Sequence, residues 1–157
     1  MTDRNVPVGA DADATADALR LSLEVEIPSD VRYIERVVEI VRHQCRAMSF
    51  ESHHCSLNVP VALSEALANA ILRGNAEDPD KHVTVRASLT ARNLVLEVQD
   101  EGLGFDIESC TVDVSDPDNL EREDGRGLFL MRQLMHRVEQ YADGGNVVRL
   151  TLNRGAM

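Results

Sequence analysis

Lysine is almost absent from this chain: among its 157 residues there is one, Lys81. The common phosphate-binding loop needs a lysine directly after a glycine, because its ammonium group reaches the β and γ phosphates of a nucleotide. Lys81 follows Asp80, so a site of this type is excluded. Acidic residues outnumber basic ones, 27 to 16, and the net charge of -11 argues against nucleic acid or an anionic membrane surface as the main partner.

Cysteine and long apolar runs are also scarce. The three cysteines are an odd number at wide spacing, which indicates buried thiols in a reducing compartment and not a disulfide framework. No apolar run approaches the roughly 20 residues that cross a bilayer, and no signal peptide is recognisable, so we expect a cytoplasmic protein. His53, His54 and Cys55 make a weak zinc candidate, because adjacent ligands rarely converge on one ion.

The length and the apolar content fit one domain with one core. Residues 1–18 are polar and rich in alanine, so we expect a disordered tail followed by a single folded domain over 19–157. Alternating and helical hydrophobic periods predict the elements of that domain. The predicted strands are Leu19–Ile27, His82–Leu89, Asn93–Gln99, Tyr141–Ala142 and Val147–Leu152, and the predicted helices are Ser29–Met48, Asn58–Gly74 and Gly127–Gln140.

This order of elements predicts an α+β fold. Strands adjacent in sequence, with the helices in a separate group, imply a two-layer sandwich: a mostly antiparallel sheet covered on one face by helices. We take Ser29 as the N-cap of the first helix. Residues 100–124 lack either period, and a stretch that long is typical of a functional lid or of disorder.

Three short motifs carry candidate chemistry. Glu65 and Asn69 are four residues apart on a predicted helix, so both side chains project from the same side of it. An amide oxygen is a hard ligand suited to Mg²⁺, and a glutamate one turn earlier could act as a general base. Taken alone, the pair is also what a solvated helix face looks like.

The second motif is Asp100-Glu101-Gly102-Leu103-Gly104, at the end of a predicted strand. Its carboxylate could accept a hydrogen bond from an exocyclic amine such as that of adenine, and glycines let the backbone approach a ring closely. It does not complete a dinucleotide fingerprint, because Ile107 stands where a third glycine belongs. An ordinary strand-to-turn link is the alternative interpretation.

The third motif, Gly125-Arg126-Gly127-Leu128, opens a predicted helix. The free amides and positive dipole end of a helix favour anions, and Arg126 could supply the charge that a missing lysine does not. A flexible glycine entry to a helix is the alternative.

Together these motifs resemble the gyrase, chaperone and histidine-kinase (GHKL) type of ATP-binding fold, the Bergerat fold, and within it the anti-sigma-factor serine/threonine kinases of bacteria. The segments that carry the resemblance are SEALANAILRGN, LEVQDEGLGFD, DGRGLFLMRQLMHRVE and VVRLTL, and it extends from about Leu21 to Leu152. It implies a mostly antiparallel mixed sheet. Two residues depart from the pattern of this family. Arg73 stands where histidine is frequent, and His136 stands where an acidic residue is frequent.

The resemblance also implies residue roles. Glu65 would be the catalytic base and Asn69 the magnesium ligand, with Asp100 the adenine contact. The other nucleotide-binding positions would be Gly102 and Gly104 at the base, Gly125, Arg126, Gly127 and Leu128 at the phosphates, and Thr151 supporting the adenine from the last strand.

At the level of function, the resemblance implies an ATP- and Mg²⁺-dependent serine/threonine protein kinase. It would phosphorylate an anti-anti-sigma (STAS-type) protein, sequester a sigma factor and form a homodimer, without direct contact to nucleic acid or membrane. Two alternatives stay open: a nucleotide-gated binding module with little or no kinase activity, and a simple ATPase motor or dimer clamp.

Overall fold

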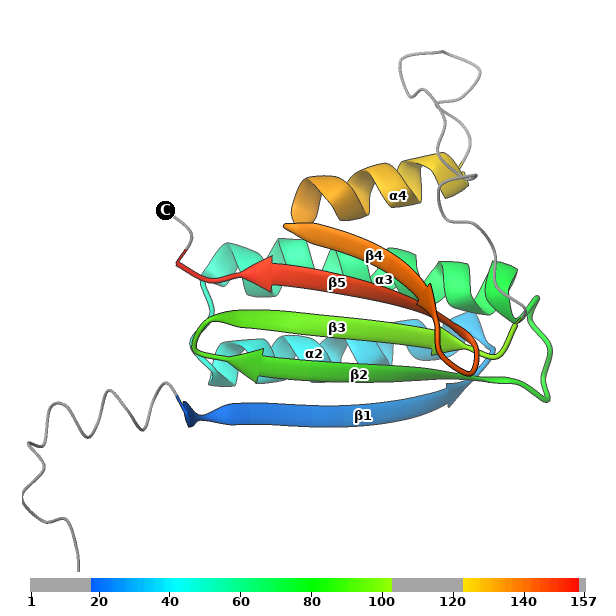
Figure 1. Ribbon diagram of the computed structural model, residues 1–157, viewed down its shortest axis with the longest axis horizontal. Coiled ribbons are helices and arrows are strands. Elements are labelled where there is room, and N and C mark those ends of the chain that lie inside the picture. Colours follow the sequence, from blue (N-terminus) through cyan, green and yellow to red (C-terminus); the bar gives the residue numbers. More distant parts are fainter. Residues whose placement is uncertain (1–17, 103–122, 156–157) are drawn as a thin grey trace, which may run out of the picture.

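Five strands form one sheet, and helices cover one of its faces (Figure 1). The computed structural model describes residues 18–102 and 123–155. The strands lie in the order β1-β2-β3-β5-β4, and every neighbouring pair is antiparallel. Their bounds are β1 Arg20–Pro28, β2 His82–Thr90, β3 Asn93–Asp100, β4 Arg137–Ala142 and β5 Asn146–Asn153. The expected α+β class is confirmed, but the expected mixed sheet is wrong in the described ranges, where no parallel pair occurs.

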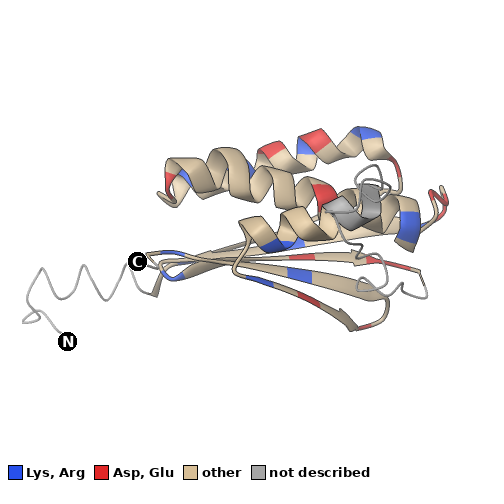
Figure 2. Ribbon diagram, turned by 90° about the horizontal axis from the view of Figure 1, so that it is seen from above, with Lys and Arg blue, Asp and Glu red and all other residues tan. Residues whose placement is uncertain are grey.

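Three helices, α2 Ile34–Ala47, α3 Val59–Asn69 and α4 Glu123–Leu134, lie on the same side of the sheet (Figure 2). A 3₁₀ turn, Val31–Tyr33, precedes α2. Wide π-helical turns continue α3 at both ends, His54–Asn58 before it and Ala70–Gly74 after it. Helix α3 packs against both α2 and α4, so it is the central helix of the layer.

The core lies between the helices and the inward face of the sheet. Strict alternation along β2 and β3 buries every second side chain, and the central helix supplies fully buried Leu63, Leu67 and Ile71. The segment His54–Gly74 also has the length and apolarity of a membrane span, with mean hydropathy 1.3. Leu63, Leu67 and Ile71 of this segment fill the core, whereas Leu57 and Leu72 are exposed.

The third predicted helix, Gly127–Gln140, has both ends wrong: α4 begins at Glu123, before the predicted start, and it ends earlier than predicted. Its apolar positions continue at helical spacing to Val138, but α4 ends at Leu134 and β4 follows from Arg137. Strand β4 pairs with β5 along its whole length, from Arg137 opposite Thr151 to Ala142 opposite Asn146. Val138 packs against the core in either conformation, so its spacing could not separate helix from strand.

Two predicted helix starts are also wrong. Asp30, not Ser29, caps the first helical turn, since its Oδ1 accepts a hydrogen bond from the Arg32 backbone N–H at 2.9 Å. The Ser29 hydroxyl instead donates to the Lys81 carbonyl at 2.8 Å. The second helical segment is already helical at His54, before the expected start near Asn58, although it ends at Gly74 as predicted.

Candidate functional site

Helix α3 presents Glu65 and Asn69 as one ridge. Both side chains are partly exposed, while Leu63 and Leu67 on its other sides are fully buried in the core. Glu65 and Asn69 therefore lie on one face of α3, as their four-residue spacing predicts. The carboxylate and the amide project together from the helical layer.

Gly127 of α4 lies directly against this ridge. A Cβ built on Gly127 would stand 2.8 Å from Glu65 Oε2 and 3.9 Å from Asn69 Nδ2. Real Cβ atoms essentially never approach another atom to within 3.0 Å, so a side chain at this position would displace the carboxylate. Glycine thus lets α4 approach the Glu65 carboxylate closely, and the first and third motifs, 62 residues apart in sequence between Glu65 and Gly127, meet in space.

Asp100 ends β3, and glycines lie close to it on several sides. It is 1% exposed, and a Cβ at Gly74 would collide with its carboxylate. A Cβ at Gly102 would collide with the Gly74 carbonyl, and one at Gly145 with the Asp100 carbonyl. Three glycines from separate segments therefore permit close backbone approach around one carboxylate.

The Asp100 carboxylate is held by two hydrogen bonds. The Gly102 backbone N–H donates to Oδ1 at 2.9 Å, and the Asn146 side-chain amide donates to Oδ2 at 3.2 Å. Burial raises the pKa of Asp100 above its ordinary value of 3.8, although these two donors and the charge of Lys81 act in the opposite direction. A desolvated, fixed carboxylate of this kind is suited to accept a hydrogen bond from a ligand amine.

One helical segment connects the two places. Asn69 ends α3, and the π-helical turn Ala70–Gly74 runs on from it to the carboxylate of Asp100. The first and second motifs therefore border one region along α3 and the turn that follows it. Gly74, Gly145 and Asn146 belong to it and were not predicted as site residues. The sequence Asp143-Gly144-Gly145-Asn146 is typical of a hairpin turn and does not indicate a contact with Asp100.

Thr151 does not belong to this region, so the adenine role expected for it is wrong. Residues Leu150 and Leu152 on either side are buried toward the helices, which puts Thr151 on the opposite, uncovered face of the sheet. There it lies opposite Val95 and Arg137. On the same strand, Asn146 is the residue that faces Asp100.

The remaining predicted residues have mixed outcomes. Gly104 lies outside the described residues. Gly125 and Arg126 lie within α4, but their side chains are outside the described part. Leu128 is 1% exposed and belongs to the hydrophobic core, so its side chain is not available to a phosphate.

The predicted set His53, His54 and Cys55 does not converge on one point, although Glu51, His53 and His54 each place a ligand atom within 4.8 Å of the others. Cys55 is buried and its thiol contacts the Phe50 carbonyl at 3.7 Å, turned into the core. His53 instead lies beside the carboxylate of Glu51, with 3.4 Å between Nδ1 and Oε2. Cys45 and Cys55 are both free and buried, as expected, and Cys110 lies outside the described residues.

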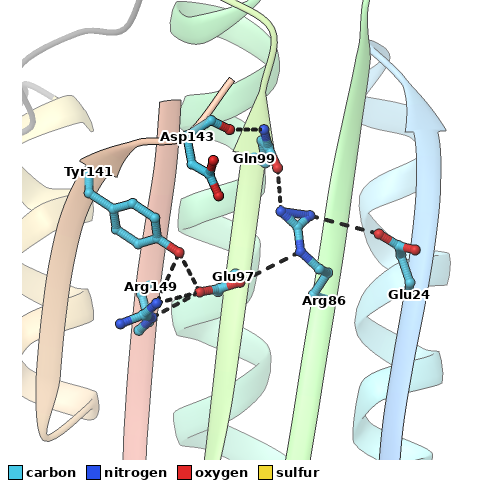
Figure 3. Close-up of polar contacts among 7 residues, drawn as sticks. All are labelled: Glu24, Arg86, Glu97, Gln99, Tyr141, Asp143 and Arg149. Atoms are coloured by element: carbon cyan, nitrogen blue, oxygen red, sulfur yellow. Dashed lines mark hydrogen bonds and ion pairs between the residues drawn. The ribbon is translucent and has the colours of Figure 1, made fainter. Parts of the chain in front are cut away.

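The uncovered face of the sheet carries a separate polar network (Figure 3). Arg149 donates from Nε to Glu97 Oε2 at 2.9 Å, and Tyr141 donates to the same carboxylate oxygen. Arg86 links Glu97 to Gln99, which in turn donates to the Asp143 carbonyl at 2.8 Å. A shallow hollow of about 880 Å³ lies over this face, on the far side of the sheet from Glu65 and Asp100.

The residues present fit a magnesium–nucleotide in two respects. Glycines let the backbone approach the carboxylates of Glu65 and Asp100 more closely than any larger residue would allow. The donors at the ridge, a carboxylate and an amide, are hard oxygen ligands of the kind Mg²⁺ prefers. In donor chemistry and in backbone approach, the residues present therefore fit a magnesium–nucleotide.

Comparison with known proteins gives a consistent result. The model of the family described as "Histidine kinase-like ATPase domain" matches residues 27–152. The chain is 30% identical over 105 residues to the serine-protein kinase RsbW of Listeria monocytogenes serovar 1/2a, covering 64% of this chain and 67% of that protein. It is 27% identical over 135 residues to RsbW of Bacillus subtilis strain 168, covering 82% and 83%. It is 34% identical over 100 residues to the anti-sigma F factor of Clostridium acetobutylicum, covering 62% and 68%.

A solved structure has a similar fold. The RsbU and RsbW domains of Rv1364c from Mycobacterium tuberculosis match with a TM-score of 0.58 and 18% identity. The match covers 85% of this chain and 32% of that one, so this chain spans about a third of it. At this identity the likeness shows the fold alone.

Proposed function

Because the chain belongs to the histidine kinase-like ATPase domain family, we propose that it is an ATP-dependent serine/threonine protein kinase that acts as an anti-sigma factor. Its substrate would be a serine or threonine of an anti-anti-sigma protein. The observation that carries the proposal is the meeting of Glu65, Asn69 and Gly127 at one place. The names of the relatives, serine-protein kinase RsbW and anti-sigma F factor, support the same function.

Glu65 is proposed as the catalytic base. During transfer, the acceptor hydroxyl oxygen forms a bond to the γ phosphorus, the bond from that phosphorus to the β–γ bridging oxygen breaks, and ADP leaves with the electron pair. Glu65 would accept the hydroxyl proton. Its partly exposed position on α3 leaves room for a protein substrate to approach.

Asn69 is proposed to hold Mg²⁺ through its amide oxygen. When bound, the ion would neutralise charge on the phosphate oxygens. Gly125 and Arg126 would bind the phosphates in the first turn of α4, where backbone amides favour anions, and Gly127 would let the phosphates approach Glu65 just after it. The carboxylate of Asp100 would accept a hydrogen bond from the adenine amine, with Gly102 and Gly104 beside the ring.

The proposed partners follow from the same relatives: a sigma factor, and an anti-anti-sigma protein of the STAS type. We further propose a homodimer, a cytoplasmic location and a catalytic domain over residues 19–157. Transfer to the anti-anti-sigma protein would decide which of the two partners is held.

Incubation with radiolabelled ATP, Mg²⁺ and the cognate anti-anti-sigma protein tests the proposal. We expect label on the acceptor with the wild-type chain and none with Glu65→Gln, while ATP still binds to the variant. Glu35→Gln, on the exposed first turn of α2, is the control and should transfer normally. Wild-type protein that binds both partners in a nucleotide-dependent way but transfers no label would instead favour the binding-switch alternative.

A further inference from the structure

Asn75 is a buried polar residue with no role in the site so far. It follows Gly74 directly and is 1% exposed. Its side-chain amide donates to the Ser29 hydroxyl oxygen at 2.8 Å and to the His82 carbonyl at 2.9 Å. Its Oδ1 accepts a hydrogen bond from the Glu101 backbone N–H at 2.8 Å. Both side-chain donors and the acceptor are therefore used.

These three bonds join segments that are distant in sequence. Ser29 follows β1, His82 begins β2 and Glu101 follows β3, while Asn75 itself ends the helical segment that carries Glu65 and Asn69. The Asn75 backbone N–H also donates to the Ala70 carbonyl at 2.8 Å, which fixes the residue to the last helical turn. One side chain thus ties three strand ends to the central helix.

The bond to Glu101 bears directly on the base end of the site. Glu101 lies between Asp100 and Gly102, and the Gly102 N–H donates to the Asp100 carboxylate. The Glu101 backbone N–H donates to Asn75 Oδ1, so a side chain outside the turn fixes the position of its backbone. We propose that Asn75 is a positioning residue for the nucleotide: it holds the turn that carries Asp100 and Gly102 against Gly74.

Asparagine is the residue type that this place requires. Serine, with a shorter side chain, has one hydroxyl for three partners, and aspartate keeps an acceptor but cannot donate to the His82 carbonyl. Alanine removes the partner of the Glu101 N–H and of the His82 carbonyl, and both bonds are partly buried, so their loss weakens the hold on the turn. The turn then relaxes, and the Asp100 carboxylate moves relative to the glycines around it.

The inference rests on the proposed nucleotide function, and the experiment separates the two. Dissociation constants for ATP and ADP with Mg²⁺ are measured by calorimetry on the full chain, together with KM and kcat for transfer to the anti-anti-sigma protein. For Asn75→Ala we expect both dissociation constants to rise by the same factor, about tenfold, because the bond that holds the Glu101 turn, one of the three lost, is worth about that much. At saturating ATP, kcat should stay within about twofold of wild type, because Glu65 and Gly127 are not moved.

Asn58→Ala is the matched control. Asn58 is also a partly buried asparagine, and its amide donates to the Leu134 carbonyl at 2.8 Å, joining α3 to the end of α4. We expect it to lower Tm without changing either nucleotide constant. A merely structural role for Asn75 would give the same pattern in both variants.

The outcomes are distinct. A wild-type chain that takes up no ATP overturns the proposed function. If the wild type binds ATP, two results for a folded Asn75→Ala overturn the positioning role alone. One is that the variant binds ATP as well as the wild type does, and the other is that its kcat falls while its KM is unchanged. If Asn75→Ala does not fold, Ser29→Ala replaces it: it removes one acceptor of the same amide, and we expect a smaller, equal rise for ATP and ADP, whereas unchanged constants would refute the role.

Discussion

Substitution of Gly127 by alanine is the sharpest test of the geometry at the phosphate end. The added methyl carbon would lie 2.8 Å from Glu65 Oε2, and ordinary contact begins at 3.4 Å. The Glu65 carboxylate is the end of a flexible, partly exposed side chain, so it will move, by about 0.6 Å, the difference between 3.4 and 2.8 Å, and α4 will not. A displacement of about 1 Å at a catalytic group costs about 100-fold in rate, so this shift costs roughly 15-fold. We therefore expect kcat for phosphoryl transfer to fall by roughly tenfold or more.

Stability should change little in the same variant. Gly127 lies in the interior of α4, where alanine is favoured over glycine by about 1 kcal/mol. Forcing a side chain away from its preferred rotamer costs about 0.5–1.5 kcal/mol. The two effects nearly cancel, so Gly127→Ala should unfold within a few degrees of the wild type. Loss of rate without loss of stability is the expected signature.

The assay compares transfer rate, ATP dissociation constant and Tm for the wild type, Gly127→Ala and a control, Gln133→Ala. Gln133 is exposed on the same helix, so its removal changes the helix surface and not the space beside Glu65. Gln133→Ala should behave as wild type in all three measurements. A folded Gly127→Ala that transfers phosphate at the full rate would show that Glu65 does not act from this position.

Three further predictions concern other parts of the molecule. Chelation of Mg²⁺ should weaken ATP binding to the wild type, whereas Asn69→Ala should bind weakly with or without chelator, as calorimetry with and without EDTA would show. Asn146→Ala should weaken ATP binding through the lost bond to Asp100, while Thr151→Val, on the other face of the sheet, should leave it within about twofold. Burial opposes the ionisation of Glu97, but hydrogen bonds from Tyr141 and Arg149 outweigh it and place the pKa of Glu97 below its ordinary 4.5. The ionised Glu97 therefore contributes its full stability above pH 4.5, and this contribution is lost as pH falls through the lowered pKa. The acid-unfolding curves of wild type and Glu97→Gln should differ above pH 4.5 and converge below the lowered pKa.

Much of the architecture could be read from local patterns. Strands β2 and β3 each alternate without interruption, and the ExxxN spacing fixed the shared ridge of Glu65 and Asn69. These features depend only on the period of a strand or a helix. They do not require knowledge of what lies opposite.

The errors concern features decided by distant partners. Met135 and Val138 fit a helical period, yet the chain leaves the helix because β4 satisfies its backbone on β5. Ser29 has the residue type of an N-cap, but its hydroxyl is used by Lys81 and Asn75, which lie about 50 residues away. Serine and aspartate are both favoured at N-caps, and the tertiary hydrogen bonds of Ser29 leave Asp30 as the cap.

The choice between Asn146 and Thr151 shows the same limit at the site. Both lie on β5, five residues apart, so they must face opposite sides of the sheet. Which one faces the helices depends on the pairing of Asp100 with Asn146, and that register is set between strands. Sequence spacing alone therefore identified the strand but not the side chain.

The wide turn at the end of α3 explains how one helix serves both ends of the site. The Asn75 N–H bonds the carbonyl of Ala70, five residues back, where an α-helix would bond four back. The extra residue in this turn changes which side chains face the end of β3: Gly74 lies against Asp100, and Asn75 reaches the strand ends. If the α-helix continued regularly through residue 75, the residues after Ala70 would be rotated about the helix axis, because each residue of an α-helix adds roughly 100°. Gly74 would then no longer face the Asp100 carboxylate. The ridge of Glu65 and Asn69 would keep its place. The π-helical turn is therefore the feature that brings Gly74 to Asp100 while Glu65 and Asn69 stay on the same continuous helical segment.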